Sequence, residues 1–525
     1  NTNIGLYDLG ESYFNELINR SMIQPIGVEN YGYIYGCRVH DMVLDLARSL
    51  TSEQNFVTVL DNDEQRKPES TNARRLALHR TSITSYQFAN VDMKKVRSFV
   101  ATECNTGNNS VAPPRFQVLR VLFLDRCNGM ANYIGRSLQH AGRQCHLRCL
   151  RLSSYAHFDR VPKELGHLKF LKVLDLGDSY GTIKELPEEL GLLTQLLCLR
   201  IPHGLEMVPA GLIGKLTSLQ QLDINLAEEV AVRQFAKELG NLRELRMLYA
   251  DLYNGLRDQS MQIDFLQSLG SLHKVHTMHI YGTTVKDGTR PDAGSVSCPR
   301  LWQLSLTCIK FFSLPMWVNS STLGCLSHLD VKVQVVKEQD METLGRLPML
   351  CYLELDSQYT RLVSIKKKLA DDGYFQKLRI FRTPCSFVRF DLHGCESISG
   401  ASIFMPRLES LEFSVDVRFL KDAADLHAGL NNLLAGFNDF GRTSLKRVNA
   451  KISCKDALAV EVKEAEVALA NAAHDHSNRP VLQIYRISEK KMRSPGDNEV
   501  RVCTVRNVLR SFQSIFLMLV FCLHI

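Results

Sequence analysis

The chain has 525 residues, of which 45% are hydrophobic and 23% are charged, a composition that predicts packed cores and excludes a wholly disordered protein. Its net charge of +7 comes without a long run of Lys and Arg, so the sequence gives no support to nucleic-acid binding. The 15 cysteines include no CxxC pair, and we expect reduced thiols in a cytoplasmic protein.

The first 60 residues predict a helix, a hairpin and a second helix. The segment "LGESYFNELINRS" (Leu9–Ser21) carries its apolar residues on one helical stripe. "MIQPIGVENYGYIYGCRVHD" follows, and its turn-rich centre between apolar stretches predicts a short hairpin. Further apolar residues then recur at helical spacing, namely Val39, Met42, Val43, Leu46, Ala47 and Leu50. We expect them to form a packed amphipathic helix that starts at His40 and Asp41. Residues 1–60 therefore have the outline of the end of a winged-helix module.

A charged segment that contains Pro68, "DNDEQRKPESTN" at 61–72, predicts a linker. From residue 73 to 454 one template then recurs about a dozen times, with a period of roughly 23 to 26 residues in its clearest copies. Each copy begins LxxLxL and continues through an LP-like or VP-like turn into xxLGxL. Two examples are "HLRCLRLSSYAHFDRVPKELGHL" and "FLKVLDLGDSYGTIKELPEELGLL".

This template is that of a leucine-rich repeat, in which LxxLxL is a short strand with its leucines pointing inward. Neighbouring repeats must stack to cover one another's apolar faces. We therefore predict an α/β fold, a leucine-rich-repeat solenoid with a curved parallel sheet on its concave face, preceded by the small winged-helix module.

The residues between the strand leucines are expected to form an exposed row on the concave face. Because the row mixes both signs of charge with aromatic side chains, it is more typical of a protein-binding surface than of a phosphate-binding one. The alternative is a face that is merely solvated. The row comprises Arg151, Asp175, Arg200, Asp223, Tyr249, Asp251, His279, Tyr281, His328, Asp330, Tyr352, Glu354 and Arg382.

Residues 455–487 predict a C-terminal cap, with a helix at Lys455–His474 and a final strand in "RPVLQIYRI". From 488 to 525 the pattern is lost, and this tail is left unassigned. Its apolar run "SIFLMLVFCLHI" has 12 residues, whereas a membrane span needs about 20, so we expect no membrane contact.

The segments "LGESYFNELINRSMIQP" and "CRVHDMVLDLARSL" closely resemble the winged-helix end of the NB-ARC module in plant disease-resistance proteins. The repeats resemble the C-terminal half of those proteins, and "VKEAEVALANAAHDHSNRPVLQI" resembles the C-terminal segment of their grass members. The resemblance covers about Leu9 to Ile484. It implies a fragment of an intracellular innate-immune receptor whose repeats sense a pathogen effector or a guarded host protein. It also implies autoinhibition, in which the repeats pack on an NB-ARC module in the same chain or in trans.

The same family carries a Met-His-Asp motif beside bound ADP. By resemblance, His40 would approach the phosphates and Asp41 would orient it, while Val39 replaces the methionine. No GxxxxGK[ST] loop occurs in this chain, and the nearest stretch, "PAGLIGKLTS" at 209–218, reads as a turn within a repeat. We therefore expect no cofactor here, and ADP or ATP contacts at His40 and Asp41 only in a full-length chain that carries the P-loop.

Metal and catalytic sites find little support. "HKVHTMH" spaces His273, His276 and His279 three apart, but residues three apart on a strand point to opposite faces. There is no GxSxG elbow. We expect a protein that is not an enzyme and holds no metal. The alternative to the receptor fragment is a stand-alone leucine-rich-repeat scaffold or adaptor from a truncated receptor gene.

Overall fold

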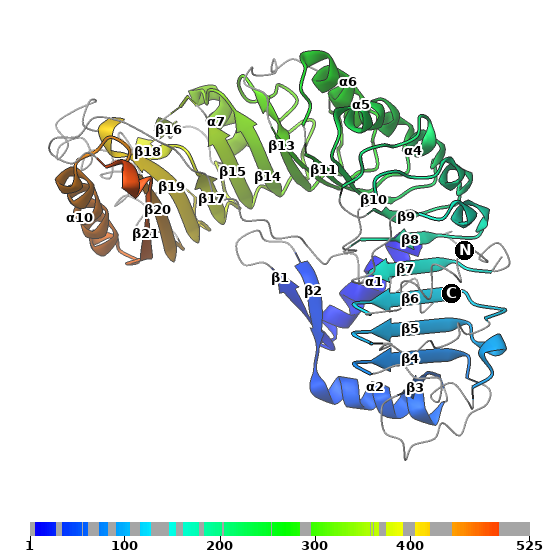
Figure 1. The fold of residues 1–525 in the computed structure, drawn as a ribbon. Coiled ribbons are helices and arrows are strands. Elements are labelled where there is room, and N and C mark those ends of the chain that lie inside the picture. Colours follow the sequence, from blue (N-terminus) through cyan, green and yellow to red (C-terminus); the bar gives the residue numbers. More distant parts are fainter. Residues whose placement is uncertain are drawn as a thin grey trace. The chain divides into compact units, whose positions relative to one another are not determined.

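A computed structural model gives two compact units, one within residues 1–254 and the other within residues 255–507, and Figure 1 labels their helices and strands. Each unit is described by itself. The structure describes residues 6–27, 34–54, 56–60, 73–81, 91–105, 116–127, 146–153, 161–177, 183–201, 204–253, 255–283, 296–357, 359–360, 362–366, 374–391, 405–419 and 444–492.

The first unit starts with a helix, a hairpin and a second helix, as the sequence predicts. Helix α1 (Leu6–Asn19) leads into β1 (Ile23–Gly27) and β2 (Ile34–Val39), and α2 (Asp41–Glu53) follows directly. The two strands pair antiparallel. The predicted outline of the end of a winged-helix module is confirmed.

The apolar stripe on α2 is largely uncovered. The side chains of Met42, Leu46 and Leu50 are 75%, 57% and 44% exposed. The expectation of a packed helix is therefore wrong for this stripe within the described residues. Helical spacing determines which face is apolar, but it does not determine what covers that face.

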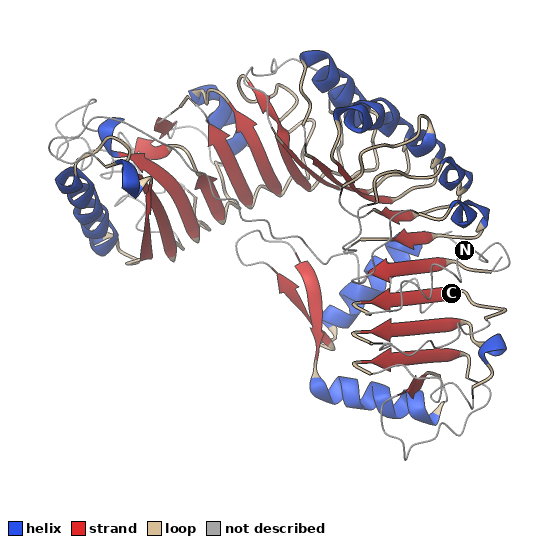
Figure 2. Ribbon diagram, viewed as in Figure 1, coloured by secondary structure: helices blue, strands red, loops and turns tan. Residues whose placement is uncertain are grey.

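The repeats of the first unit form a sheet of nine described strands in which every neighbouring pair is parallel (Figure 2). They follow one another in chain order, which is the expected topology of a solenoid. The strands are β3 (Thr58–Leu60), β4 (Arg75–His79), β5 (Ser98–Thr102), β6 (Val121–Asp125), β7 (Cys149–Ser153), β8 (Val173–Asp175), β9 (Cys198–Arg200), β10 (Gln221–Leu226) and β11 (Met247–Leu252).

The described return segments of this unit contain short helices. They are η2 (Met93–Lys95), η4 (Lys163–His167), η5 (Glu188–Leu192), α4 (Leu212–Lys215), α5 (Glu229–Glu238) and η6 (Leu239–Asn241). The LGxL part of the template lies in these turns. Its glycine is required where the turns of successive repeats touch. A Cβ atom on Gly166 would lie 2.2 Å from the carbonyl oxygen of Glu189 in the next repeat, so only glycine fits.

Among its described residues, the second unit holds eight further strands of the repeat sheet, in parallel pairs, and four helical segments. The strands are β12 (Thr277–Gly282), β13 (Gln303–Phe311), β14 (His328–Val333), β15 (Tyr352–Ser357), β17 (Ile380–Thr383), β19 (Ser410–Asp416), β20 (Arg447–Ser453) and β21 (Val481–Ile487). The helices are α6 (Gln259–Gly270), α7 (Glu338–Gly345), α10 (Ala459–Asp475) and η7 (Glu489–Lys491). A separate parallel pair is formed by β16 (Leu362–Lys366) and β18 (Phe387–Asp391).

The repeat sheet extends beyond the segment assigned to repeats from the sequence. Strand β3, within residues 1–60, pairs with β4. Strand β21, within the predicted cap, pairs with β20, and α10 matches the helix expected there. The linker at 61–72 and the apolar run at 514–525 lie outside the described residues.

The leucines of each LxxLxL template form the core. Leu150, Leu174, Leu199, Leu222 and Leu248 follow one another on adjacent strands, and each is at most 1% exposed. Each strand therefore buries its leucines against its neighbours rather than within its own repeat.

Replacement of one core leucine tests this packing. Leu222→Ala should lower the free energy of unfolding by about 2–5 kcal/mol, since it opens a cavity in a closely packed core. Leu192→Ala, at a side chain that is 56% exposed, is the matched control and should cost far less. Urea unfolding followed by circular dichroism measures both, and equal losses would contradict the assigned core.

Candidate functional site

The predicted concave row does lie on one side of each sheet, at the third, fifth or seventh residue counted from the first leucine of LxxLxL. We keep the name concave face for the side that carries the third and fifth template residues. On the first unit, Arg151, Asp175, Arg200 and Asp223 are register partners on β7 to β10, and Tyr249 follows on β11.

These charges form an alternating ladder of ion pairs, which we call the charge ladder (Asp125, Arg151, Asp175, Arg200 and Asp223). The Nη1 atom of Arg151 lies 3.0 Å from Oδ2 of Asp175, and its Nη2 lies 3.4 Å from Oδ1 of Asp125. Arg200 contacts Oδ2 of Asp175 at 3.4 Å and Oδ2 of Asp223 at 2.9 Å. Each inner charge therefore lies between two charges of opposite sign.

The ladder is not the exposed row that the sequence predicts. Arg151, Asp175 and Arg200 are buried, and so are His279, His328 and Tyr352 in the second unit. The expectation of exposure is wrong for these six residues. The strand pattern gives the face correctly, whereas burial depends on side chains contributed by neighbouring repeats.

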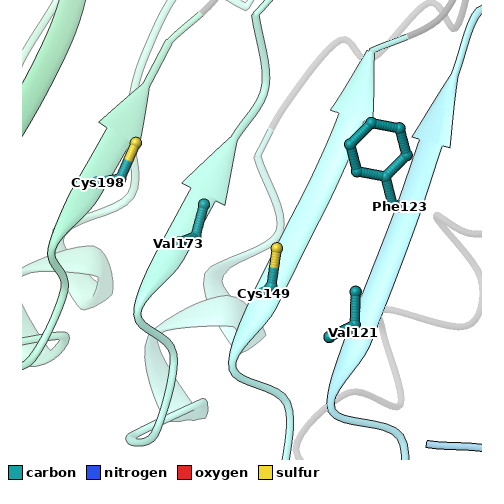
Figure 3. Close-up of a cluster of buried hydrophobic side chains, with 5 residues drawn as sticks. All are labelled: Val121, Phe123, Cys149, Val173 and Cys198. Carbon is teal, nitrogen blue, oxygen red and sulfur yellow. The ribbon is translucent and has the colours of Figure 1, made fainter. Parts of the chain in front are cut away.

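An apolar row runs beside the ladder at the third template residue. Val121, Cys149, Val173 and Cys198 are register partners on β6 to β9, and with Phe123 they form a buried cluster (Figure 3). The guanidinium of Arg151 lies 5.0 Å from the centroid of the Phe123 ring. On these strands the described concave face is therefore a second, mixed core rather than an open surface.

More of the predicted row is accessible elsewhere. Asp223, Tyr249 and Asp251 on β10 and β11 are half-buried, and Tyr281 on β12 is exposed. In the second unit Asp330, Glu354 and Arg382 are half-buried on β14, β15 and β17. These residues are the part of the predicted row that remains available to a partner.

Aromatic stacking organises the concave face of the second unit. The rings of His328 and Tyr352 stack with centroids 5.8 Å apart, and Arg382 lies over Tyr352 at 5.6 Å. Arg382 also approaches Glu354 at 3.7 Å and Glu412 at 3.4 Å. Burial lowers the pKa of His279 to about 4, so this histidine is neutral at neutral pH.

His40 and Asp41 stand at the start of α2 in the first unit. The Nδ1 atom of His40 accepts a hydrogen bond of 3.3 Å from the backbone N–H of Met42, and its carbonyl accepts from Leu44 at 2.9 Å. His40 therefore caps the helix. An imidazole that accepts at Nδ1 has its proton on Nε2, where it can donate to an external phosphate oxygen. Asp41 is exposed in the first turn of the helix.

The P-loop-like stretch at 209–218 is a turn within a repeat. Its short helix α4 directs the backbone N–H groups of Gly211 and Gly214 to the buried Glu238 carboxylate, with the Gly214 contact at 2.9 Å. A carboxylate from the next return segment therefore occupies the place that a phosphate takes in a P-loop.

A contact between two described side chains joins the winged-helix end to the repeats. The Arg246 guanidinium, immediately before β11, binds the Asp8 carboxylate on α1 through both of its terminal nitrogens, one of them at 3.0 Å. Bidentate pairs of this kind fix orientation as well as adding energy. Sequence spacing gives no signal for it because the two residues are 238 positions apart.

A row of Arg and Lys residues at the second template position was not predicted from the sequence. The row comprises Arg74, Arg97, Arg120, Arg148 and Lys172, which precede successive strands. The backbone N–H of each residue after Arg74 donates to the carbonyl of the previous member. Burial, and secondarily the charge of Arg148, lower the pKa of Lys172. We call these five residues the basic row. They lie more than 20 positions apart in sequence, so no run of basic residues reveals them.

The described part of the chain contains neither a candidate metal site nor a candidate membrane-spanning helix. His273 lies in the turn before β12, and only His279 of the three spaced histidines lies on the strand. No group of three potential ligands gathers among the described residues. No described helix has the length and apolar character that a bilayer crossing requires.

Comparisons with known proteins agree with this architecture. Residues 95–482 match the family described as leucine-rich repeat region, and residues 1–47 match the disease resistance protein winged helix domain. A leucine-rich-repeat protein of Leptospira interrogans shares the fold, with a TM-score of 0.50 at 16% identity, covering 81% of this chain and 99% of that one.

Two rice relatives cover most of the chain. Disease resistance protein PIK6-NP of Oryza sativa subsp. japonica is 23% identical over 499 residues, which is 84% of this chain and 46% of the relative. Disease resistance protein RGA5 of the same subspecies is 24% identical over 423 residues, covering 78% and 36%. The chain thus spans about half the length, or less, of the curated relatives it matches.

The fold and its concave face define a leucine-rich-repeat protein. The chain belongs to the family of the leucine-rich repeat region, and its winged-helix end and its relatives are similar to plant disease resistance proteins.

Because the charge ladder is buried, replacing one of its arginines should lower the free energy of unfolding far more than replacing an exposed arginine. Arg151→Met should destabilise the first unit by about 3 kcal/mol or more, because it leaves the buried Asp175 and Asp125 with fewer countercharges. Arg233→Met, at the exposed pair with Glu229 on α5, should cost about 1 kcal/mol or less. Urea unfolding gives both values, and a negligible loss for Arg151→Met would show that the ladder contributes little.

Proposed function

We propose that this chain is the sensing and restraining part of an intracellular plant immune receptor, and that it has no catalytic role. The accessible residues of the concave face bind a pathogen effector or a guarded host protein. The winged-helix end connects the repeats to an NB-ARC module. A partner activates the receptor only if it binds the open state more tightly than the closed state. The relatives, which are disease resistance proteins at least twice as long as the matched region, support this assignment.

The observation that carries the proposal is the apolar stripe on α2. Contiguous exposed apolar surface marks an interaction site in a soluble protein. Met42, Leu46 and Leu50 form such a surface along α2, the helix that begins directly after His40, the residue that resemblance assigns to the nucleotide. A nucleotide-binding module packed on this stripe would cover it and place its ADP near Nε2 of His40.

Two further features fit a restraining role. The pair between Asp8 and Arg246 holds the winged-helix end against the repeats of the first unit. The basic row adds five positive charges to one edge of the same sheet, and such an edge favours contact with an acidic surface. Both would orient the repeats toward the nucleotide-binding module.

The alternative is a stand-alone repeat scaffold or adaptor from a truncated receptor gene. Sequencing the transcript upstream of Asn1 separates the two. A P-loop and a coiled coil in the same reading frame support the receptor. A stop codon or a genuine start codon close to Asn1 supports the scaffold.

Nucleotide binding gives the first functional prediction. The purified chain should show no saturable binding of ADP or ATP by calorimetry, because His40 supplies one donor and the P-loop-like turn is already filled by Glu238. The full-length receptor is the positive control. Micromolar binding by this chain alone would contradict the proposal.

Charge exchange tests the contact between α1 and the repeats. In the full-length receptor expressed in leaves, Asp8→Arg or Arg246→Asp should cause cell death without an effector. Each reversal replaces attraction by repulsion, which is enough to shift a balanced equilibrium several-fold. The double exchange should restore the resting state, since the pair is re-formed with opposite polarity.

The matched control for this experiment is Arg243→Asp, in the exposed turn just before the contact. It makes the same change of charge and should leave the receptor silent. If the double exchange were as active as the single ones, the contact would not restrain the receptor.

A further inference from the structure

The last strand of the second unit has an open edge. Strand β21 pairs with β20, and no other described strand of this unit pairs with it (Figure 1). The N–H of Val481 donates to the carbonyl of Lys446, immediately before β20, at 2.8 Å. In a parallel ladder every second residue bonds the same neighbour, and the residues between them point the other way. The backbone N–H and C=O groups of Leu482, Ile484 and Arg486 therefore face the open edge.

The concave side of this edge is apolar and uncharged. Val481, Tyr485 and Ile487 are 62%, 50% and 41% exposed, and Gln483 between them is also exposed. Edge strands of soluble proteins are usually protected by charged side chains, a proline or a bulge. The register of β21 with β20 is unbroken, and its one charged residue, Arg486, alternates to the opposite face. An edge with so little protection is a template for another strand.

The backbone of β21 fits a second copy of itself in antiparallel register. With Ile484 on a two-fold axis, Leu482 of one copy lies opposite Arg486 of the other. All three residues direct their backbone groups outward, so each outward N–H meets a carbonyl of the other copy. If the axis moved by one residue to Gln483, Arg486 would have no strand residue opposite it. The register centred on Ile484 therefore pairs the whole edge.

The same register matches the side chains of the concave face. Val481 of each copy lies opposite Ile487 of the other, and Gln483 lies opposite Tyr485. Apolar side chains directly opposite each other stabilise an antiparallel pair. Within one copy the Tyr485 hydroxyl donates to Oε1 of Gln483 at 2.8 Å. The amide nitrogen of Gln483 can therefore donate to the Tyr485 hydroxyl of the other copy.

Charges at the ends of β21 favour the antiparallel orientation. The exposed Arg479 lies two residues before the strand, and the exposed Glu489 lies two residues after it. Antiparallel pairing brings Arg479 of each copy toward Glu489 of the other, whereas parallel pairing would bring like charges together. Arg486 is neutralised within its own copy by Glu466 at 2.6 Å and Glu489 at 2.9 Å. Charge therefore opposes only the parallel arrangement.

From these observations we propose that the chain forms a reversible homodimer through β21, in which two second units share one sheet across a two-fold axis at Ile484. Both copies present the same surface, as an isologous interface requires. Because the paired strands are short, the association is weak and depends on protein concentration. The inference goes beyond the proposed function and does not depend on it, because it uses neither the immune role nor the winged-helix end.

Analytical ultracentrifugation of the whole chain over a wide range of concentration tests the dimer. The monomer has a mass of 59.5 kDa. The weight-average mass should rise toward twice this value at micromolar concentrations and fall again on dilution. A chain that stays monomeric over the whole range would overturn the proposal.

Two charged variants test the register. Val481→Lys with Ile487→Lys sets lysine opposite lysine at both ends, and Val481→Glu with Ile487→Glu sets glutamate opposite glutamate. Each variant alone should remain monomeric, because like charges directly opposite each other repel. An equimolar mixture should dimerise, since each lysine then lies opposite a glutamate. Association of either variant alone at the parental strength, or no association in the mixture, would contradict this register.

The matched control is Phe312→Lys with Met316→Lys, at side chains of the second unit that are 49% and 71% exposed. It makes the same change of charge away from β21 and should dimerise like the parental chain. All the substituted side chains are exposed, so the fold should persist, which circular dichroism checks. A monomeric control would show that added charge, and not the β21 edge, explains the loss.

Hydrogen exchange at single-residue resolution gives an independent readout. The amides of Leu482 and Ile484 should exchange several-fold more slowly at high protein concentration, because the other copy accepts their hydrogen bonds. The amide of Tyr485, which faces β20, should not change. If the chain is monomeric and the first two amides are protected at every concentration, another segment covers the edge and the dimer is wrong.

Discussion

The stacking of one repeat on the next is the constraint on which the rest of this structure depends. A single LxxLxL strand has one apolar side and cannot bury it alone. Leu150, Leu174 and Leu199 are buried because adjacent strands place them in one continuous layer, with backbone hydrogen bonds holding the register. The same register brings residues from separate repeats into rows one strand apart. The charge ladder, the apolar cluster and the basic row are such rows.

The rows have different roles in the two units. In the first unit the concave face of β6 to β9 carries the apolar cluster and the charge ladder, and both are buried. In the second unit the equivalent positions hold half-buried carboxylates and stacked aromatic rings. The same template positions therefore hold buried, stabilising side chains in one stretch of the sheet and accessible polar side chains in another. In the proposed receptor, a partner would bind the accessible part of the concave face and not the buried part on β6 to β9.

Much of this could be predicted from the sequence, because periodicity is a local property. The helix, hairpin and helix at the start, the strands of the repeats and α10 all follow from spacing alone. Burial could not be predicted in the same way. Arg151 and Asp330 both occupy the fifth template residue, yet one is fully buried and the other accessible, since their neighbours come from other repeats. The apolar spacing of α2 likewise could not show which surface, if any, packs on that helix.

The alternating charges of the ladder restrict how the repeat array can change in length. Along β7 to β10 the fifth template residue reads Arg, Asp, Arg, Asp. Removal of the repeat that carries Asp175 would place Arg151 beside Arg200, two buried cations with no carboxylate between them. Removal of two adjacent repeats would keep the alternation. Gain or loss of repeats in this stretch is therefore tolerated in even numbers, a parity rule that the leucine template does not impose.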